Sequence, residues 1–297
     1  MANNWFEQKE KGSFILLKIT FYLVYFLPKF VLTPIIFLVS FVYFIISKNE
    51  RQNLKKFYAN LNAKFATKHK NRFLNFYEFS NSLTDKIAVW LGKIKFDDLI
   101  LDNERELNKL FFSGGSGKVV IVSHFGNIEI ARALSSHAKG LKMAILVYDK
   151  NSANFTNIIN SLSKTNIKTF KVDELDISSM LEISNFIDGG GFICVMGDRT
   201  PLNGNKTTQV KFLGKMADFP QGGFAIASIL KCDIWALWCI KIKGKYHLKA
   251  DFLANDVNRR KIGSYIQIYA DLLAQNCKSY PQMWFNFFDY WGKNEKL

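Results

Sequence analysis

Short apolar runs recur along the chain from residue 118 onward, and segments with a different spacing of apolar residues separate them. The runs are rich in β-branched and aromatic residues, a composition that favours β-strands. The predicted strands cover residues 118–123, 142–148, 167–172, 192–196, 234–243 and 246–253. The last two flank Lys243-Gly244-Lys245, and we expect them to form an antiparallel hairpin.

The segments between these strands carry apolar residues at helical spacing. The predicted helices lie near residues 127–137, 152–164, 178–188, 221–230 and 257–277. Strands that alternate with helices in this way predict an α/β fold with a mixed, mostly parallel sheet flanked by helices.

The N-terminal pattern is different, because residues 14–46 are apolar almost throughout. Lys18 and Lys29 carry the only charges in this segment. Pro28-Lys29 and Thr33-Pro34 divide it into two pieces, each about 20–25 Å long as a helix and shorter than a hydrocarbon core of about 30 Å. It can be one kinked, tilted span, two helices lying in the bilayer, or a buried hairpin. Its apolar residues occur on nearly all sides, which favours a membrane anchor.

A strongly basic segment follows. Residues 48–72 contain eight Lys or Arg residues against Glu50 alone. Such a flank is typical of the cytoplasmic side of a membrane, where it meets anionic headgroups. We therefore predict a membrane anchor over residues 1–47, a basic helical region over 48–112 that packs on the catalytic domain, and the catalytic domain over 113–297.

Composition agrees with a folded protein that has an anionic partner. The chain of 297 residues is 48% hydrophobic and has a formal net charge of +15. Its four cysteines show no C-x-x-C spacing, so we expect reduced thiols rather than disulfides or a zinc site. The four histidines are too dispersed for a local metal cluster, and neither a metal nor a cofactor is expected.

Several common catalytic and nucleotide-binding motifs do not occur in the sequence. The stretch SGGSGK at 113–118 fails as a phosphate-binding loop, since Phe112 replaces the first glycine and Val119 replaces the final Ser or Thr. No dinucleotide fingerprint occurs, and no G-x-S-x-G elbow supplies a serine nucleophile.

His124 is the strongest candidate for catalytic chemistry. It follows a predicted strand, and α/β sheets bind their ligands at the carboxyl ends of strands. Gly126 allows a sharp turn, and Asn127 can cap the helix that follows. Glu129 then lies in the first helical turn, where it can hold one imidazole nitrogen and leave the other as a general base. The alternative is a histidine bonded by local backbone, with Glu129 merely favourable at a helix N-terminus.

The stretch HFGNIE (124–129) resembles the H-F-G-N-W-E motif of the lipid A late acyltransferases, the lauroyl/myristoyl transferase family. Three later stretches resemble further blocks of that family in order, namely GDRTP (197–201), VKFLGKMADFPQGGFAIAS (210–228) and YPQMWFNFFDYW (280–291). The N-terminal WFEQKEKGSFILLKI is similar to a subgroup linked to aryl-polyene and other glycolipid pathways. The resemblance covers nearly the whole chain and implies a glycerolipid acyltransferase-like fold.

Two differences from the family pattern bear on the acceptor. Ile128 replaces the usual tryptophan, and the residues at 148–150 are Tyr-Asp-Lys where lipid A enzymes often have Tyr-Arg-Pro. The implied acceptor is therefore a lipid A precursor of lipopolysaccharide biosynthesis or a related glycolipid or lysolipid.

The resemblance implies an O-acyltransferase on the cytoplasmic face of the bacterial inner membrane. Its donor would be an acyl-carrier-protein thioester, and its acceptor a hydroxyl of a membrane glycolipid or lysolipid. His124 would take the proton of the attacking hydroxyl, and Glu129 would balance the charge. No covalent intermediate is needed, because a thioester is already activated.

Four further residues are candidates for substrate binding. Arg199 would bind a phosphate or stabilise the oxyanion, with Asp198 orienting it, unless the two form a structural ion pair. Asn127 and the helix N-terminus near Gln221 would also face the substrate. A set of aromatic residues can either line an acyl groove or belong to the core, namely Trp284, Phe285 and Phe287.

A non-catalytic basic membrane protein that binds anionic lipid or nucleic acid is the alternative. It accounts for the charge and the apolar segment but gives His124 and Glu129 no role. No recognised nucleic-acid module occurs, and the basic residues concentrate beside the apolar segment. We therefore expect an anionic membrane surface, and no nucleic acid, as partner.

Overall fold

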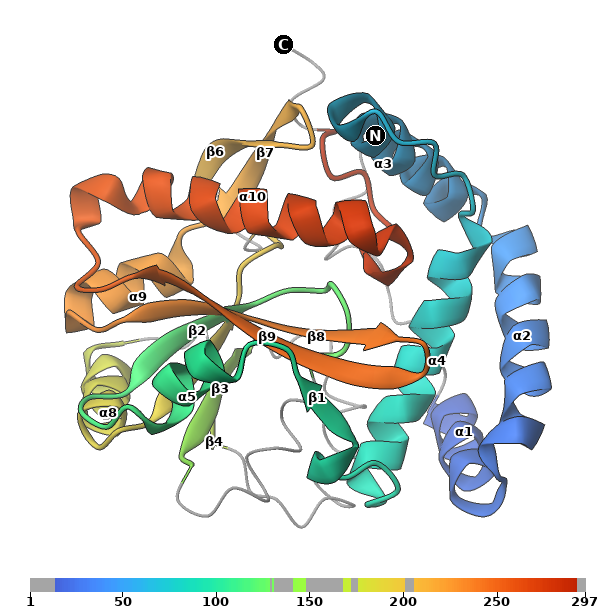
Figure 1. Ribbon diagram of the computed structural model, residues 1–297, viewed down its shortest axis with the longest axis horizontal. Helices are drawn as coiled ribbons and strands as arrows, with labels where there is room; N and C mark the ends of the chain where they lie inside the picture. The colour runs from blue at the N-terminus through green and yellow to red at the C-terminus, as the bar shows by residue number, and fades with distance from the viewer. Residues whose placement is uncertain are drawn as a thin grey trace. The chain divides into compact units, whose positions relative to one another are not determined.

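The computed structural model describes residues 14–128, 130, 141–147, 168–171, 176–200 and 206–292. Eight α-helices lie within this part of the chain (Figure 1). They are α1 Phe14–Phe26, α2 Lys29–Ile46, α3 Lys48–Phe65, α4 Phe73–Trp90, α5 Glu104–Phe112, α8 Ile177–Asp188, α9 Gly222–Leu230 and α10 Ile262–Ser279. The helix predicted over 152–164 and most of that predicted over 127–137 lie outside the described residues.

Nine strands are described. They are β1 Leu99–Leu101, β2 Lys118–Val122, β3 Met143–Val147, β4 Lys168–Lys171, β5 Phe192–Met196, β6 Thr207–Phe212, β7 Lys215–Pro220, β8 Ile234–Ile242 and β9 Lys245–Ala254. Seven of them form one sheet in the order β1-β9-β8-β2-β5-β3-β4. Every neighbouring pair is parallel except β8–β9, which is antiparallel. The predicted α/β fold with a mixed, mostly parallel sheet flanked by helices is confirmed.

The predicted strand positions are also confirmed to within one or two residues. The β8–β9 hairpin turns at Lys243 and Gly244, whose φ angles are both positive, as a two-residue type I′ turn requires. The sequence pattern missed β1, which has only three residues, and the β6–β7 hairpin. That hairpin turns at Leu213 and Gly214, and leucine is an unusual residue for a left-handed turn position.

The chain divides into two compact units, each built from segments that are distant in sequence. The first comprises Met1–Ile94, Lys211–Ala217 and Ala270–Leu297, and the second comprises Lys95–Val210 and Asp218–Tyr269. The seven-stranded sheet lies entirely in the second unit. The division into an anchor over 1–47, a basic region over 48–112 and a catalytic domain over 113–297 concerns function and stays a prediction.

The core of the second unit surrounds β2. All five residues of this strand are buried, as expected for a parallel strand covered on both faces. Helix α9 packs on β2 and β5, and α8 packs on β5. Trp238 of β8 stacks on Tyr269 of α10 at a centroid distance of 5.5 Å, and both side chains are fully buried. This aromatic pair packs α10 against one face of the sheet.

The first unit is helical and is held together by a buried asparagine. Asn75 of α4 accepts a hydrogen bond from the Tyr58 hydroxyl of α3 at 2.8 Å. Its amide donates to the carbonyl oxygens of Pro281 and Trp284 at 3.0 and 3.2 Å. One side chain therefore connects α3, α4 and the C-terminal segment. Desolvation of the Tyr58 hydroxyl raises its pKa well above the usual range, so this donor stays protonated.

The apolar N-terminal segment forms two helices that break at Pro28, as predicted. Helix α2 continues through Pro34, so no second break occurs there. The residues that flank Pro34 on the buried face, Leu32 and Ile36, contact α1 and α4 in one apolar cluster. This packing offsets the backbone hydrogen bond that Pro34 cannot donate.

Helix α2 is the one helix among the described residues that is long and apolar enough to cross a membrane. Its mean hydropathy is 2.3, and 17% of its residues are buried. Core helices and signal sequences share such length and hydropathy. The exposed surface of α2 therefore says more about its surroundings than its hydropathy does. Large apolar side chains are exposed on both α1 and α2, for example Phe26 at 72% and Phe30 at 78%. Apolar surface of this extent is typical of an interaction site.

A pair of adjacent glycines in α9 tests how tightly this helix packs on the sheet. A Cβ atom on Gly223 would lie 2.5 Å from Ile121 Cδ1 and 3.3 Å from Val195 Cβ, whereas one on Gly222 would meet nothing within 4 Å. We expect Gly223→Ala to lower the free energy of unfolding by about 1–3 kcal/mol through overpacking. Gly222→Ala should be neutral or slightly stabilising, because alanine favours helix. Denaturant unfolding of both variants measures the difference, and equal effects would contradict the packing.

Candidate functional site

The candidate site forms where two neighbouring strands end. Strands β2 and β5 are parallel, and their register pairs Val122 with Met196. His124 and Asp198 each follow two residues later, so both emerge at the carboxyl edge of the sheet. The next strand after β2 is β3, which lies beyond β5, and the next strand of this sheet after β5 is β8, which lies beyond β2. The carboxyl edge of parallel strands is where α/β sheets bind their ligands.

His124 and Asp198 are joined by two hydrogen bonds. The backbone N–H of His124 donates to Asp198 Oδ2 at 2.9 Å, and its Nδ1 lies 2.9 Å from Asp198 Oδ1. A carboxylate in its ionised form can only accept, which favours the tautomer that has the proton on Nδ1 and the basic lone pair on Nε2. The Asp198 side chain is completely buried, and 24% of the His124 side chain is exposed. The imidazole is therefore held in its orientation by a carboxyl group that solvent does not reach.

The turn after β2 depends on a glycine. Gly126 has φ +75°, and a Cβ atom there would lie 2.1 Å from the carbonyl oxygen of Cys239 on β8. Asn127 donates its backbone N–H to that same oxygen at 2.8 Å. The backbone N–H of Phe125 contacts the Ser123 hydroxyl oxygen at 3.2 Å. The segment that carries His124 is thus bonded to β8 on one side and to itself on the other.

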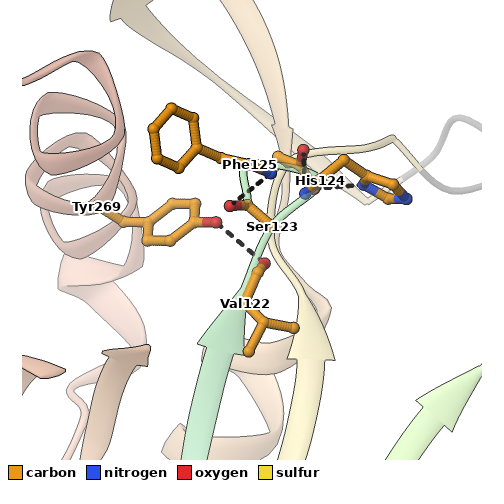
Figure 2. Close-up of polar contacts among 6 residues, drawn as sticks. Val122, Ser123, His124, Phe125 and Tyr269 are labelled. Atoms are coloured by element: carbon orange, nitrogen blue, oxygen red, sulfur yellow. Dashed lines mark hydrogen bonds and ion pairs between the residues drawn. The ribbon is translucent and has the colours of Figure 1, made fainter. Parts of the chain in front are cut away.

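Tyr269 supports this segment from the opposite side. Its hydroxyl donates to the carbonyl oxygen of Val122 at 3.0 Å. Figure 2 shows the Tyr269 ring reaching the end of β2 from α10, while the His124 imidazole points away from that helix. The same carbonyl also accepts the N–H of Gly197 at 2.8 Å, which links β2 to the residue before Asp198. Two hydrogen bonds therefore hold the end of β2, directly before His124.

The structure shows a contact of Asp198 that the sequence did not predict. The sequence assigned Asp198 to the orientation of Arg199, and Glu129 to His124. Asp198 is bonded to His124, and its predicted action on Arg199 stays a prediction. Glu129 lies outside the described residues, so its role stays a prediction as well. Arg199 is half-buried and follows Asp198 directly, so its backbone lies beside the pair. Its proposed contact with an anion also stays a prediction.

The other predicted site residues have structural contacts. Asn127 is buried at 3% exposure, next to His124 in the turn. Gln221 precedes α9, and its side-chain amide donates to the Thr207 carbonyl at 3.0 Å and to the Thr208 hydroxyl at 2.7 Å. These bonds occupy both N–H groups of the amide and connect α9 to β6. Substrate binding by Asn127 and Gln221 therefore stays a prediction. The observed contacts show how Gln221 joins α9 to β6 and that Asn127 is buried in the turn after β2.

The C-terminal aromatic residues belong to the core of the first unit. Trp284 stacks on Phe57 at 6.0 Å, and Phe285 meets Phe79 at 5.5 Å edge to face. Trp284 and Phe285 are 1% and 6% exposed. Of the two interpretations left open by the sequence, these contacts favour core packing.

Within the described part of the chain, no group of three or more His, Cys, Asp or Glu residues could hold a metal ion. All four cysteines are buried. Burial raises the pKa of the Cys232 thiol to about 11, so this group is protonated and unreactive at neutral pH. A second histidine–carboxylate contact joins His247 of β9 to Asp102 at 2.7 Å.

No protein-family model matches this chain, and no curated protein matches it.

The close approach of Gly126 to β8 yields a stability prediction with a matched control. Gly126→Ala places a methyl group against the Cys239 carbonyl and in a left-handed conformation, whereas Gly244→Ala meets the same φ preference, at +83°, in open space. We expect Gly244→Ala to lower the free energy of unfolding by about 1–2 kcal/mol and Gly126→Ala to lower it clearly more. Thermal and denaturant unfolding measure both, and equal losses would show that the turn after His124 can relax away from β8.

Proposed function

We propose that the protein is a membrane-associated O-acyltransferase that moves an acyl chain from a carrier-protein thioester to a hydroxyl of a membrane glycolipid or lysolipid. The His124–Asp198 pair carries this proposal. It is a buried carboxylate that holds a partly exposed imidazole at the carboxyl edge of a mostly parallel sheet. That arrangement is the one a general base requires.

The proposed reaction is a single displacement. The Nε2 atom of His124 takes the proton of the acceptor hydroxyl while the hydroxyl oxygen attacks the thioester carbonyl carbon. The tetrahedral intermediate collapses, the C–S bond breaks, and the imidazolium returns the proton to the departing thiolate. Asp198 stabilises the imidazolium between these two proton transfers. The products are the ester and the free thiol of the donor, so no enzyme nucleophile is required.

The resemblance to the lipid A late acyltransferases supports the substrate classes and the finer, glycerolipid acyltransferase-like fold. In that scheme Arg199 binds an acceptor phosphate or the oxyanion. Glu129 would add a second carboxylate near His124. Donors of this kind are carried by acidic proteins, and a chain of net charge +15 would attract them electrostatically.

The proposed location is the cytoplasmic face of the bacterial inner membrane. Exposed apolar residues on α1 and α2 would contact lipid, and the basic α3 that follows would meet anionic headgroups. These surface properties also fit a non-catalytic protein that binds anionic lipid. The activity measurements below separate the two.

Substitutions of the pair test the chemistry. We expect His124→Ala to lower the rate of transfer from an acyl-carrier-protein thioester by about 10²–10⁴-fold, because proton removal is lost. Asp198→Asn should lower it by about 10²-fold or more, because an amide neither fixes the tautomer nor balances imidazolium. The double variant should be little worse than His124→Ala, since the two residues act together. Single-turnover kinetics with purified, membrane-reconstituted protein measure all three.

His247→Ala is the matched control, because it removes a second histidine bonded to an aspartate. It should keep a near wild-type rate. Glu129→Gln, measured in parallel, determines whether Glu129 also acts on His124. A folded His124→Ala variant that transfers acyl groups at the wild-type rate would refute the general base. Vesicle binding without transfer from any acyl thioester would favour the non-catalytic alternative.

The exposed face of α2 yields a prediction on membrane binding. Leu38 and Val42 are 63% and 48% exposed and lie one turn apart. We expect the double change to glutamate to lower binding to anionic vesicles at least tenfold, because charge replaces apolar contact with lipid. The control is the same double change at Ile177 and Leu181 of α8, which are 91% and 63% exposed at the same spacing. Vesicle sedimentation compares them, and equal losses would contradict a specific role of α2.

A further inference from the structure

We infer that α2 lies within one leaflet of the membrane rather than crossing it, so that the α1–α2 turn and α3 remain on the same side. This inference rests on the membrane association proposed above and adds its geometry. Length alone does not decide the matter, because 18 residues form a helix of about 27 Å, close to the thickness of a hydrocarbon core.

Helix α2 has two apolar faces with different surroundings. One face is buried in the first unit and contains Leu32, Ile36 and Ser40. The other exposes Leu38, Val42 and Ile45 at 63%, 48% and 56%. A helix face that meets water is normally polar. The exposed face therefore fits lipid, and the buried face shows that lipid cannot surround the helix.

Helix α4 lies along α2 over nearly its whole length (Figure 1). Near the C-terminal end of α2, Phe44 meets Phe73 at 5.7 Å and Phe76 at 5.5 Å. In the middle, Phe37 meets Tyr77 at 6.1 Å. At the N-terminal end, Lys29 Nζ lies 3.8 Å from Asp85. The contacts run in order along both helices, so α2 cannot enter the membrane to any depth without α4.

Helix α4 is not suited to a hydrocarbon core. It carries Glu78, Asp85 and Lys86 within its 18 residues. Its other side is covered by the C-terminal segment, through the Asn75 bonds and the contact of Phe76 with Phe287 at 5.0 Å. A crossing α2 would bring Glu78 and the C-terminal segment to the level of the hydrocarbon core, and it would carry Asp85 and Lys86 to the far side of the bilayer. Both effects oppose insertion. A helix in one leaflet exposes only its apolar face to lipid.

Cationic side chains mark both ends of α2. At the α1–α2 turn, Lys93 Nζ donates to the carbonyl oxygens of Val24 and Tyr25 at 2.7 and 2.8 Å. At the far end, the Arg51 guanidinium donates to the last carbonyl groups of α2 and lies 5.3 Å from the centre of the Phe44 ring. Cations that satisfy helix ends favour the headgroup level. Both ends of α2 therefore fit the headgroup level, and the charges of α4 favour the arrangement in which the two ends lie on the same side.

Cysteine labelling from the two sides of the membrane tests the inference. Lys29→Cys reports on the α1–α2 turn, where this side chain is 64% exposed, and Lys55→Cys reports on α3. Wild type is the background, since its four cysteines are buried. A membrane-impermeant maleimide is applied to spheroplasts and to inside-out vesicles that contain the full-length protein. We expect both variants to be labelled several-fold above wild type in the inside-out vesicles, and neither in spheroplasts.

Labelling of Lys29→Cys in spheroplasts, with Lys55→Cys labelled only in inside-out vesicles, would show a crossing helix and overturn the inference. Recovery of the protein only in the soluble fraction would overturn it as well. Pro28→Cys, at an exposed position in the α1–α2 turn itself, repeats the measurement if Lys29→Cys disturbs the contact with Asp85. The same labelling in the His124→Ala background keeps the result independent of the proposed acyl transfer.

Discussion

The parallel register of β2 and β5 is the constraint on which the candidate site depends. His124 and Asp198 are 74 positions apart in the sequence. They meet because Val122 is paired with Met196, and because each residue follows its own strand by two positions beyond that pair. A shift of one residue would turn the two side chains to opposite faces of the sheet. After such a shift the buried Asp198 carboxyl group would lose His124 and would have no water in its place. The hydrogen bonds between His124 and Asp198 therefore stabilise the observed register.

Glycines make this register possible at both ends of the strand pair. A Cβ atom on Gly117, before β2, would lie 1.8 Å from the carbonyl oxygen of Gly191, before β5. A Cβ atom on Gly197, after β5, would lie 2.2 Å from Ile121 Cγ2. Either side chain would force the strands apart or tilt them. The glycine that precedes Asp198 therefore has a packing role as well as its place in the GDRTP stretch.

The sequence predicted the strands better than it predicted the partners within the site. Continuous apolar runs such as 118–123 and 192–196 define buried strands whatever their neighbours are, and both were found. The contact of His124 with Asp198 was not predicted, because it arises from strand pairing that no local pattern contains. Local spacing predicted Glu129 as the partner of His124, and Glu129 lies outside the described residues. Equivalent positions after two parallel strands were the available signal, since both residues follow their strands by two positions.

The same distinction between local and tertiary information applies to the apolar N-terminal segment. Hydropathy identifies α2 but treats it as an isolated helix. Its surroundings are set by α4, whose Asp85 and Phe73 lie beside opposite ends of α2. A segment that is apolar on all sides can therefore have one face against protein and another face exposed. Sequence hydropathy measures the sum of these two faces, and in the arrangement that we infer the charges on α4 limit how deeply the exposed face enters the bilayer.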